Sequence, residues 1–273
     1  MLLMLGLGLG LEVADFRRTL RAPRGLIVGL AGQLLLLPLL GIIAVQFVDL
    51  ESAMTLGIIL LTLCPGGALS NTICSLSNAD VTLSVSLTAI SSIVAPFSIP
   101  LIYGFIVPLL SIEQSVLDVP VGVMMGRLVA VSIFPIIVGM LVRRWLSLGR
   151  KVEMPVKILS VFLFLVLIVI IVITNFDSLR TGFYRIGMTL LMLNISAIAT
   201  GIVVSKLGSL SRRQTITLSL EVGMQNAATA TFISVTLLNN TEMALPAAVY
   251  ATIMLPLAIL VGLGGRYWIG QKT

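Results

Sequence analysis

Long apolar segments follow one another along the whole 273-residue chain, and they constrain its fold more than any other feature. A helix needs about 20 apolar residues to cross the hydrocarbon core of a bilayer, which is about 30 Å thick. Only 10% of the residues are charged, whereas a soluble domain carries about 25%. The sequence therefore predicts an all-α polytopic membrane protein. The expected transmembrane helices, about nine in all, lie at roughly residues 1–14, 25–48, 53–76, 81–107, 121–142, 158–175, 182–205, 215–238 and 243–264.

Basic residues are concentrated in connections that alternate along the chain. All Lys and Arg residues except Arg127, Arg180 and Arg185 follow the first, fifth or seventh segment or lie in the C-terminal tail. Because cytoplasmic loops carry the excess of Lys and Arg, we expect the N-terminus outside and the C-terminus in the cytoplasm, which requires an odd number of spans. The net charge of +6 then reflects insertion into the cell membrane, inner or plasma, and not binding to nucleic acid.

The polar residues exclude several classes of function. The chain contains no histidine, which removes His-based proton relays, His metal sites and Ser-His-Asp catalysis. Its two cysteines, Cys64 and Cys74, lie inside one apolar segment and are expected to be packing residues. Enzymes need paired titratable groups or a metal centre, whereas the predicted membrane interior offers one carboxylate. We therefore expect a protein that is not an enzyme.

A helix break is predicted in the third segment. Pro65 lacks a backbone donor and is followed by Gly66 and Gly67, so a continuous helix is disfavoured there. The break lies about 18 Å along the segment at 1.5 Å per residue, close to the bilayer midplane. Irregular backbone at that depth is tolerated only where it is buried in protein or lines a cavity. A simple proline kink, with glycines for close helix packing, is the alternative interpretation.

The eighth segment carries a second group of atypical residues. Glu221 is the one acidic residue that we place within the membrane interior, and Gly223, Gln225 and Asn226 follow within five residues. A carboxylate at that depth costs at least about 2.5–3.5 kcal/mol unless it is compensated. A single polar residue can serve helix packing, but four atypical residues together favour a functional site.

The two interrupted segments are five spans apart, so they run in opposite directions through the membrane. Paired interruptions in two halves of a chain are typical of inverted-repeat transporters, whose crossing broken helices place free carbonyls and half-helix ends at the midplane. Such carbonyls and the carboxylate of Glu221 suit a small hard cation such as Na⁺. A proton carried by Glu221 is the competing use of the same group.

Further polar residues stand alone in apolar surroundings. Ser84 and Thr88 are four residues apart and share one helical face. Gln33 and Asn194 are isolated amides in their segments. Taken singly, each of these residues more often forms hydrogen bonds within or between helices than a functional site.

The two interrupted segments resemble those of the bile acid:sodium symporter family. The likeness is carried by two motifs, Pro65-Gly66-Gly67-x-x-Ser70-Asn71 and Glu221-Val222-Gly223-Met224-Gln225-Asn226. Gln33 precedes the first motif, and Ser84 and Thr88 follow it, at the family's spacing. The resemblance covers most of the chain, and the second motif is carried whole.

This resemblance implies a single transmembrane domain over residues 1–273, in which a core packs against a panel. Two discontinuous helices, broken at Pro65, Gly66 and Gly67 and at Gly223, would cross within the core as parts of an inverted repeat. The core would comprise the segments 25–48, 53–76, 81–107, 182–205, 215–238 and 243–264. The panel would comprise the segments 1–14, 121–142 and 158–175.

The resemblance also implies two sites for Na⁺ as the coupling ion. Both sites would share the carboxylate of Glu221. The ligands of the first would be Ser70, Asn71, Ser84, Thr88 and Glu221. The ligands of the second would be Gln33, Glu221, Gln225 and the backbone carbonyls of Val222 and Met224.

The expected substrate contacts depart from the family pattern. Asn226 matches a position that faces substrate in the family, and Asn194 is expected in the same cavity. Ala68 stands where a threonine is frequent, and the run from Ala251 to Pro256 lacks polar residues that some relatives carry. We therefore expect Na⁺-coupled symport of an organic anion, either bile-acid-like or a small carboxylate, by alternating access. The alternative is a proton-coupled exporter of organic anions that uses Glu221 as the proton carrier.

Overall fold

The computed structural model describes residues 2–10, 23–110, 120–145 and 176–270, together with scattered positions between 155 and 166. The helix expected at 158–175 therefore lies almost entirely outside the described residues. The described helices are α1 (Leu2–Gly10), α3 (Pro23–Ala31), η1 (Gly32–Leu36), α4 (Leu37–Gln46), α5 (Ser52–Leu63), α6 (Ala68–Leu76), α7 (Val81–Leu109), α8 (Val121–Leu128), η3 (Val129–Ile133), α9 (Phe134–Trp145), α11 (Phe176–Leu207), α12 (Arg212–Gly223), α13 (Ala227–Phe232), η4 (Ile233–Leu237), η5 (Glu242–Ala244) and α14 (Leu245–Gly270).

Helices long and apolar enough to cross a bilayer make up much of the described chain. Large apolar side chains on them, such as Leu35, Phe105 and Leu260, are more than half exposed, as expected where lipid is the solvent. The protein is therefore an integral membrane protein with an all-helical, polytopic architecture. The five such helices in the described residues are Pro23–Gln46, Val81–Leu109, Val121–Arg144, Arg180–Leu207 and Glu242–Gly270.

The observed helices also differ from the expected segments. α11 begins six residues before the expected start at 182, and α14 continues to Gly270. Both extensions lie beyond the apolar runs. They are possible because a helix can continue through the headgroup layer that flanks the hydrocarbon. α1 has nine described residues, too few to span alone, so the count of nine transmembrane helices stays a prediction.

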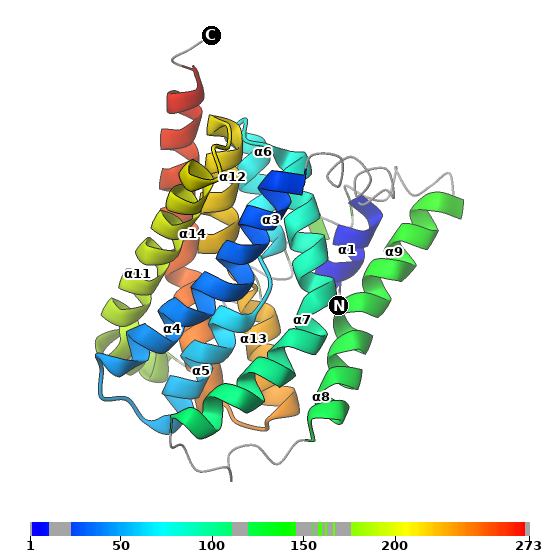
Figure 1. Ribbon diagram of the computed structural model, residues 1–273. Coiled ribbons are helices and arrows are strands. Elements are labelled where there is room, and N and C mark those ends of the chain that lie inside the picture. Colours follow the sequence, from blue (N-terminus) through cyan, green and yellow to red (C-terminus); the bar gives the residue numbers. More distant parts are fainter. Residues whose placement is uncertain are drawn as a thin grey trace.

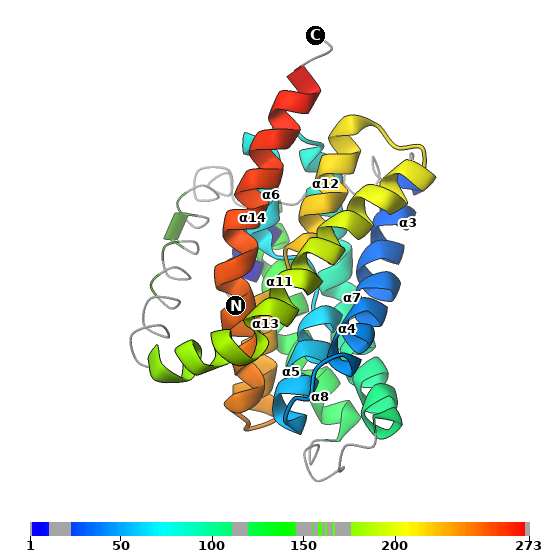
Figure 2. The ribbon, with the colours of Figure 1, turned by 90° about the vertical axis from the view of Figure 1, so that its left-hand side faces the viewer.

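The two segments with atypical residues are each divided into two half-helices. The chain leaves the helix after Leu63 and re-enters it at Ala68, and it does so again between Gly223 and Ala227. The expected segments 53–76 and 215–238 are thus the pairs α5–α6 and α12–α13. Figures 1 and 2 show α6 and α12 in the half of the molecule that contains the C-terminus, and α5 and α13 in the other half. The two broken helices therefore run antiparallel.

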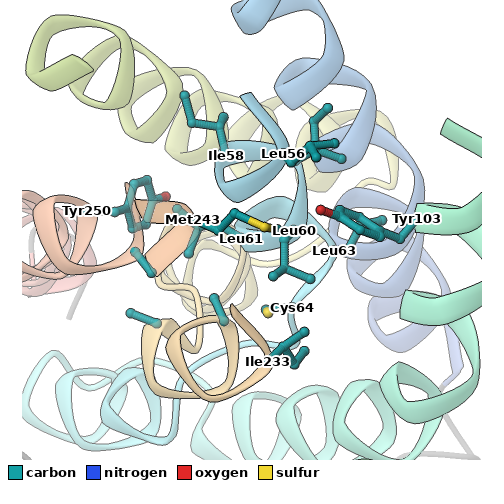
Figure 3. Packing of buried hydrophobic residues seen from close by; sticks show 14 of the residues in the cluster. Leu56, Ile58, Leu60, Leu61, Leu63, Cys64, Tyr103, Ile233, Met243 and Tyr250 are labelled. Atoms are coloured by element: carbon teal, nitrogen blue, oxygen red, sulfur yellow. The ribbon is translucent and has the colours of Figure 1, made fainter. Parts of the chain in front are cut away.

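The broken helices lie inside the protein and not at its lipid-facing surface. Every residue of α5 from Leu56 to Leu63 is buried, and so is every residue of α12 from Thr215 to Gly223. Figure 3 shows the apolar side chains of α5 enclosed between Tyr103 of α7 and Tyr250 of α14. This enclosure meets the condition for irregular backbone at membrane depth, which must be surrounded by protein.

A separate group of helices, α1, α8 and α9, lies on one side of α7 (Figure 1). α1 packs directly on α9, because a β-carbon on Gly139 would lie 2.7 Å from the backbone nitrogen of Leu9. α8 and the turn η3 contact α7. The remaining helices, including both broken ones, lie on the other side. These three helices belong to the segments expected to form the panel.

Candidate functional site

The two helix breaks meet and satisfy each other's backbone. Gly67 N donates to Met224 O at 2.8 Å, and Asn226 N donates to Pro65 O at 2.9 Å. Gly66 faces Gln225 as an isolated antiparallel bridge. An unpaired peptide group in the membrane interior costs several kcal/mol, and Pro65 has no N–H to offer. Each break therefore depends on the other for its stability, and the crossing is one unit.

Glu221 lies in the last turn of α12, beside this crossing, and is 3% exposed. Ser70 Oγ from α6 and Ser84 Oγ from α7 both donate to its Oε1 atom. Thr88 Oγ1 donates to Oε2 at 2.9 Å. Ser84 and Thr88 are one turn apart on α7, which explains why both reach the same carboxylate. The consecutive helices α6 and α7 thus converge with the distant α12 on one buried charge.

The oxygen atoms around this carboxylate outnumber the protons available to them. Asn71 Oδ1 lies 2.7 Å from Ser84 Oγ, and Gly67 O accepts from Ser70 Oγ at 2.8 Å. Gly67 O also accepts from Ser70 N at 2.9 Å. Four protons, those of the three hydroxyls and of Ser70 N, therefore face eight lone pairs on the two carboxylate oxygens, the Asn71 amide oxygen and the Gly67 carbonyl. Spare lone pairs on uncharged and carboxylate oxygens are the ligands that a hard cation prefers. The residues that fit Na⁺ in this way are those of the first predicted site: Ser70, Asn71, Ser84, Thr88 and Glu221.

A soft transition metal does not fit these surroundings. Within the part of the chain that the structure describes, no three His, Cys, Asp or Glu residues form a group that could hold a metal ion. The ligands on offer are hydroxyl, amide, carbonyl and carboxylate oxygens. Such a set favours Na⁺ over zinc or copper, which are bound by imidazole and thiolate.

Two buried glutamines form a second polar group at the crossing. Gln33 Nε2 donates to Gln225 Oε1 at 2.7 Å and to Cys64 O at 3.1 Å, and Gln225 Nε2 donates to Val222 O at 2.8 Å. Gln33 Oε1 is buried and has no hydrogen-bond partner among the described residues. An orphaned acceptor of this kind fits a bound cation.

Gln33 owes its position to a local irregularity of the first long helix. It lies in the π turn η1, where Leu37 N donates to Gly32 O and Pro38 follows without a donor of its own. π turns occur frequently at functional sites. A narrow cavity, whose empty volume of about 180 Å³ includes space that is open to solvent, is lined by residues of both polar groups: Gly29, Leu30, Gln33, Leu87, Ser91 and Glu221. The structure thus places Gln33 and Glu221 on one cavity, although the hydrogen bonds of Glu221 go to the first group.

A second pocket opens beside the crossing itself. Its empty volume, counted with the open space at its mouth, is about 350 Å³. Ala68 and Asn226, two of the three predicted substrate residues, line it, whereas Asn194 does not. Asn226 Oδ1 also accepts from Thr229 N at 3.1 Å and so caps α13. The lining contains no charged side chain and consists of Gly67, Ala68, Leu69, Met224, Gln225, Asn226, Ala227 and Met254.

Asn194 lies instead at the C-terminal end of α12, fully buried. Its Nδ2 atom donates to Gly223 O at 2.7 Å and to the Tyr250 hydroxyl at 2.8 Å. The Tyr250 hydroxyl in turn donates to Gly223 O at 2.9 Å. Tyr250 is absent from the sequence-based prediction. Its one signal is a hydroxyl in the middle of the last apolar segment, which is easily taken for a packing residue.

A protein-family model described as the sodium bile acid symporter family matches residues 1–181 of the chain. The chain belongs to this family. The resemblance seen in the two motifs is thereby confirmed. The matched region contains the first break and the Ser84–Thr88 pair, and it ends before the second break.

Three relatives of this chain illustrate the range of the family. A probable sodium/metabolite cotransporter, BASS1 of the chloroplast in Oryza sativa subsp. japonica, is 28% identical over 247 residues, 90% of this chain and 59% of that protein. An uncharacterized sodium-dependent transporter of Bacillus subtilis, YocS, is 27% identical over 83% of this chain and 69% of its own length. P3 protein of Homo sapiens is 29% identical over 82% of this chain and 46% of its own length. The chain thus spans 59% of the length of the rice relative.

Proposed function

We propose that the protein is a secondary active transporter that couples the movement of Na⁺ to symport of an organic anion by alternating access. One observation carries this proposal: the buried Glu221 carboxylate lies among the hydroxyls of Ser70, Ser84 and Thr88 at the point where the two broken helices meet. A carboxylate at that depth is costly unless something compensates it. Na⁺ at these oxygens supplies the compensating charge.

The cation sites and the open pocket share backbone, which is the basis for coupling. Gly67 accepts a hydrogen bond from Ser70 of the first ligand set, and Gly67 also lines the pocket. Met224 and Gln225 belong to the second ligand set and line the same pocket. A cation that orders these residues therefore also orders the wall of the pocket. Because coupling between two binding sites is reciprocal, a solute in the pocket strengthens Na⁺ binding to the same extent.

The surroundings of the pocket favour a negatively charged solute. One Na⁺ neutralises Glu221, and a second leaves net positive charge beside the pocket. The half-helix α6 begins at Ala68, so its positive dipole end faces the same region. Leu69 and Met254 supply apolar surface for the body of the solute. An organic anion, either a small carboxylate or a bile-acid-like molecule, combines these properties.

Alternating access would move the core against the panel. We assign α1, α8, α9 and the segment 158–175 to the panel, and the remaining helices to the core. The charge pattern predicts a cytoplasmic C-terminus, and the half of the molecule with α6 and α12 would then face the cytoplasm. Solute and Na⁺ would then reach the crossing from either side of the cell membrane in turn.

The direct test is the Glu221→Gln variant, in purified protein and in proteoliposomes. A panel of organic acids is screened first for thermal stabilisation with and without Na⁺, and uptake of a hit is then measured. The amide keeps the size of the side chain but cannot compensate a cation, so we expect loss of both Na⁺-dependent stabilisation and Na⁺-dependent uptake. Glu242→Gln, at an exposed position before α14, is the matched control and should behave as the wild type.

Two results would contradict the proposal. One is uptake that is unchanged in Glu221→Gln, and the other is wild-type uptake that is indifferent to replacement of Na⁺ by K⁺. Uptake driven by a pH gradient without Na⁺, and lost in Glu221→Gln, would instead support the proton-coupled alternative.

A further inference from the structure

The carbonyl groups at the end of α12 have unequal numbers of hydrogen-bond partners. A helix that ends leaves its last carbonyls without partners within the helix. Val222 O accepts one bond, from Gln225 Nε2, and Met224 O accepts one, from Gly67 N. Gly223 O, between them, accepts two bonds, from Asn194 and Tyr250. A carbonyl oxygen has two lone pairs, so Val222 and Met224 each keep one for a cation, whereas Gly223 does not.

The two donors to Gly223 also hold the orientation of its peptide plane. The Gly223–Met224 peptide is planar, and its other end is held because Met224 N donates to Leu220 O at 2.8 Å. With both ends of the plane held, the backbone from which the Val222 and Met224 carbonyls project is anchored on the side that faces this plane. A different rotation of this plane would turn the Gly223 carbonyl away from Asn194 and would redirect its two neighbours.

The amide of Asn194 has one fixed orientation, which leaves its oxygen atom without a hydrogen bond. Its Nδ2 atom serves both Gly223 O and the Tyr250 hydroxyl, while its Oδ1 atom is buried with no partner among the described residues. Rotating the amide would place an oxygen against the Gly223 carbonyl and would lose both bonds. Asn194 comes from α11 and Tyr250 from α14, so two further helices are tied to the end of α12.

We propose that Asn194 and Tyr250 form a positioning pair, which occupies the Gly223 carbonyl and thereby aims the Val222 and Met224 carbonyls at the second Na⁺ site. This inference rests on the proposed function. It removes Asn194 from the substrate contacts and assigns it to ion binding instead. The pair acts through the backbone and does not touch the ion.

The test is the dependence of thermal stability on Na⁺ concentration in Tyr250→Phe. Loss of a group that orients metal ligands typically lowers metal affinity by about tenfold to a hundredfold. We therefore expect the Na⁺ concentration for half-maximal stabilisation to rise by about tenfold, with K⁺ as the reference salt. Stabilisation at saturating Na⁺ should remain. Tyr103→Phe is the matched control, because Tyr103 is equally buried and its hydroxyl has no partner among the described residues.

Asn194→Leu keeps the side-chain volume and removes the amide, so it should shift the Na⁺ dependence in the same direction. If Tyr250→Phe does not fold, Asn194→Leu replaces it in the same measurement. A lower unfolding midpoint without Na⁺, combined with an unchanged half-saturating concentration, would show a structural role and overturn the inference. Absence of any Na⁺ effect in the wild type would overturn the proposed function itself, and this inference with it.

Discussion

Replacement of Gly66 by alanine tests the location of the first ion site with a single added carbon. Gly66 lies in the first break, and its φ is not positive, so the backbone accepts alanine. A β-carbon there would lie 2.6 Å from Glu221 Oε2. A β-carbon is in ordinary contact with a neighbour from 3.4 Å upward, so the carboxylate must retreat by about 0.8 Å. The added group disturbs the position of the charge while the charge itself remains.

The size of the effect follows from Coulomb's law. Oxygen ligands lie about 2.4 Å from a hard cation of the size of calcium, which Na⁺ resembles. Moving one carboxylate oxygen from about 2.4 to about 3.2 Å, at an effective dielectric constant of about 20, loses about 1.7 kcal/mol. At 1.4 kcal/mol for each factor of ten, the Na⁺ affinity should fall by about twentyfold.

The assay is thermal unfolding of the purified protein across a Na⁺ series, with K⁺ to hold ionic strength constant. Gly66→Ala should shift the half-saturating Na⁺ concentration upward by about this factor. Gly104→Ala is the control, because its β-carbon would meet its nearest neighbour at 4.0 Å. A Gly66→Ala protein with wild-type Na⁺ dependence would refute the reasoning, since no cation could then be bound to the displaced carboxylate.

Further variants separate the roles of the pocket and of the surface. Asn226→Ala should lower solute affinity and also lose the cap on Thr229, at a cost of about 1 kcal/mol of stability. Asn226→Ser keeps an oxygen that can cap α13. If the solute affinity of this variant, measured by binding, is still reduced, the reduction is due to the missing amide, which then contacts the solute in the pocket. Arg185→Ala breaks the 2.8 Å ion pair with Glu51, whose side chains are 41% and 54% exposed. Its effect on unfolding free energy should stay below about 0.5 kcal/mol, and a larger loss would contradict the view that this pair is solvent-screened.

Residues with rare chemistry for a membrane segment could be found from sequence. A carboxylate in an apolar run is costly, which makes Glu221 conspicuous, and a proline followed by two glycines is a poor helix. Ser84 and Thr88 could be paired because residues four apart share a helical face. Each of these inferences depends on one element at a time, where spacing along the chain determines position.

Contacts between elements could not be predicted in the same way. The Tyr250 hydroxyl reaches Gly223 only because α14 has a particular depth and rotation relative to α12. A helix that is apolar on all sides gives no periodic signal for that rotation. The expectation for Asn194 shows the same difficulty. The position of a lone amide in the sequence of α11 is compatible with a side chain that faces the pocket and with one that faces the end of α12. In the structure, the Asn194 amide is buried at the end of α12 and donates to Gly223 O.

The orientation of Asn71 bears on the choice between a sodium ion and a proton as the coupling ion. A proton carrier needs one carboxylate, and the hydroxyls of Ser70, Ser84 and Thr88 would be enough to solvate it. Asn71 adds a further acceptor, its Oδ1 atom, next to Ser84 Oγ. In a cluster that served the carboxylate alone, a donor at this position would be favourable, and another acceptor competes for the same hydroxyl proton. A cation resolves the competition, because it binds the surplus oxygens directly. With its amide oxygen toward Ser84, Asn71 supports the proposal that the coupling ion is Na⁺.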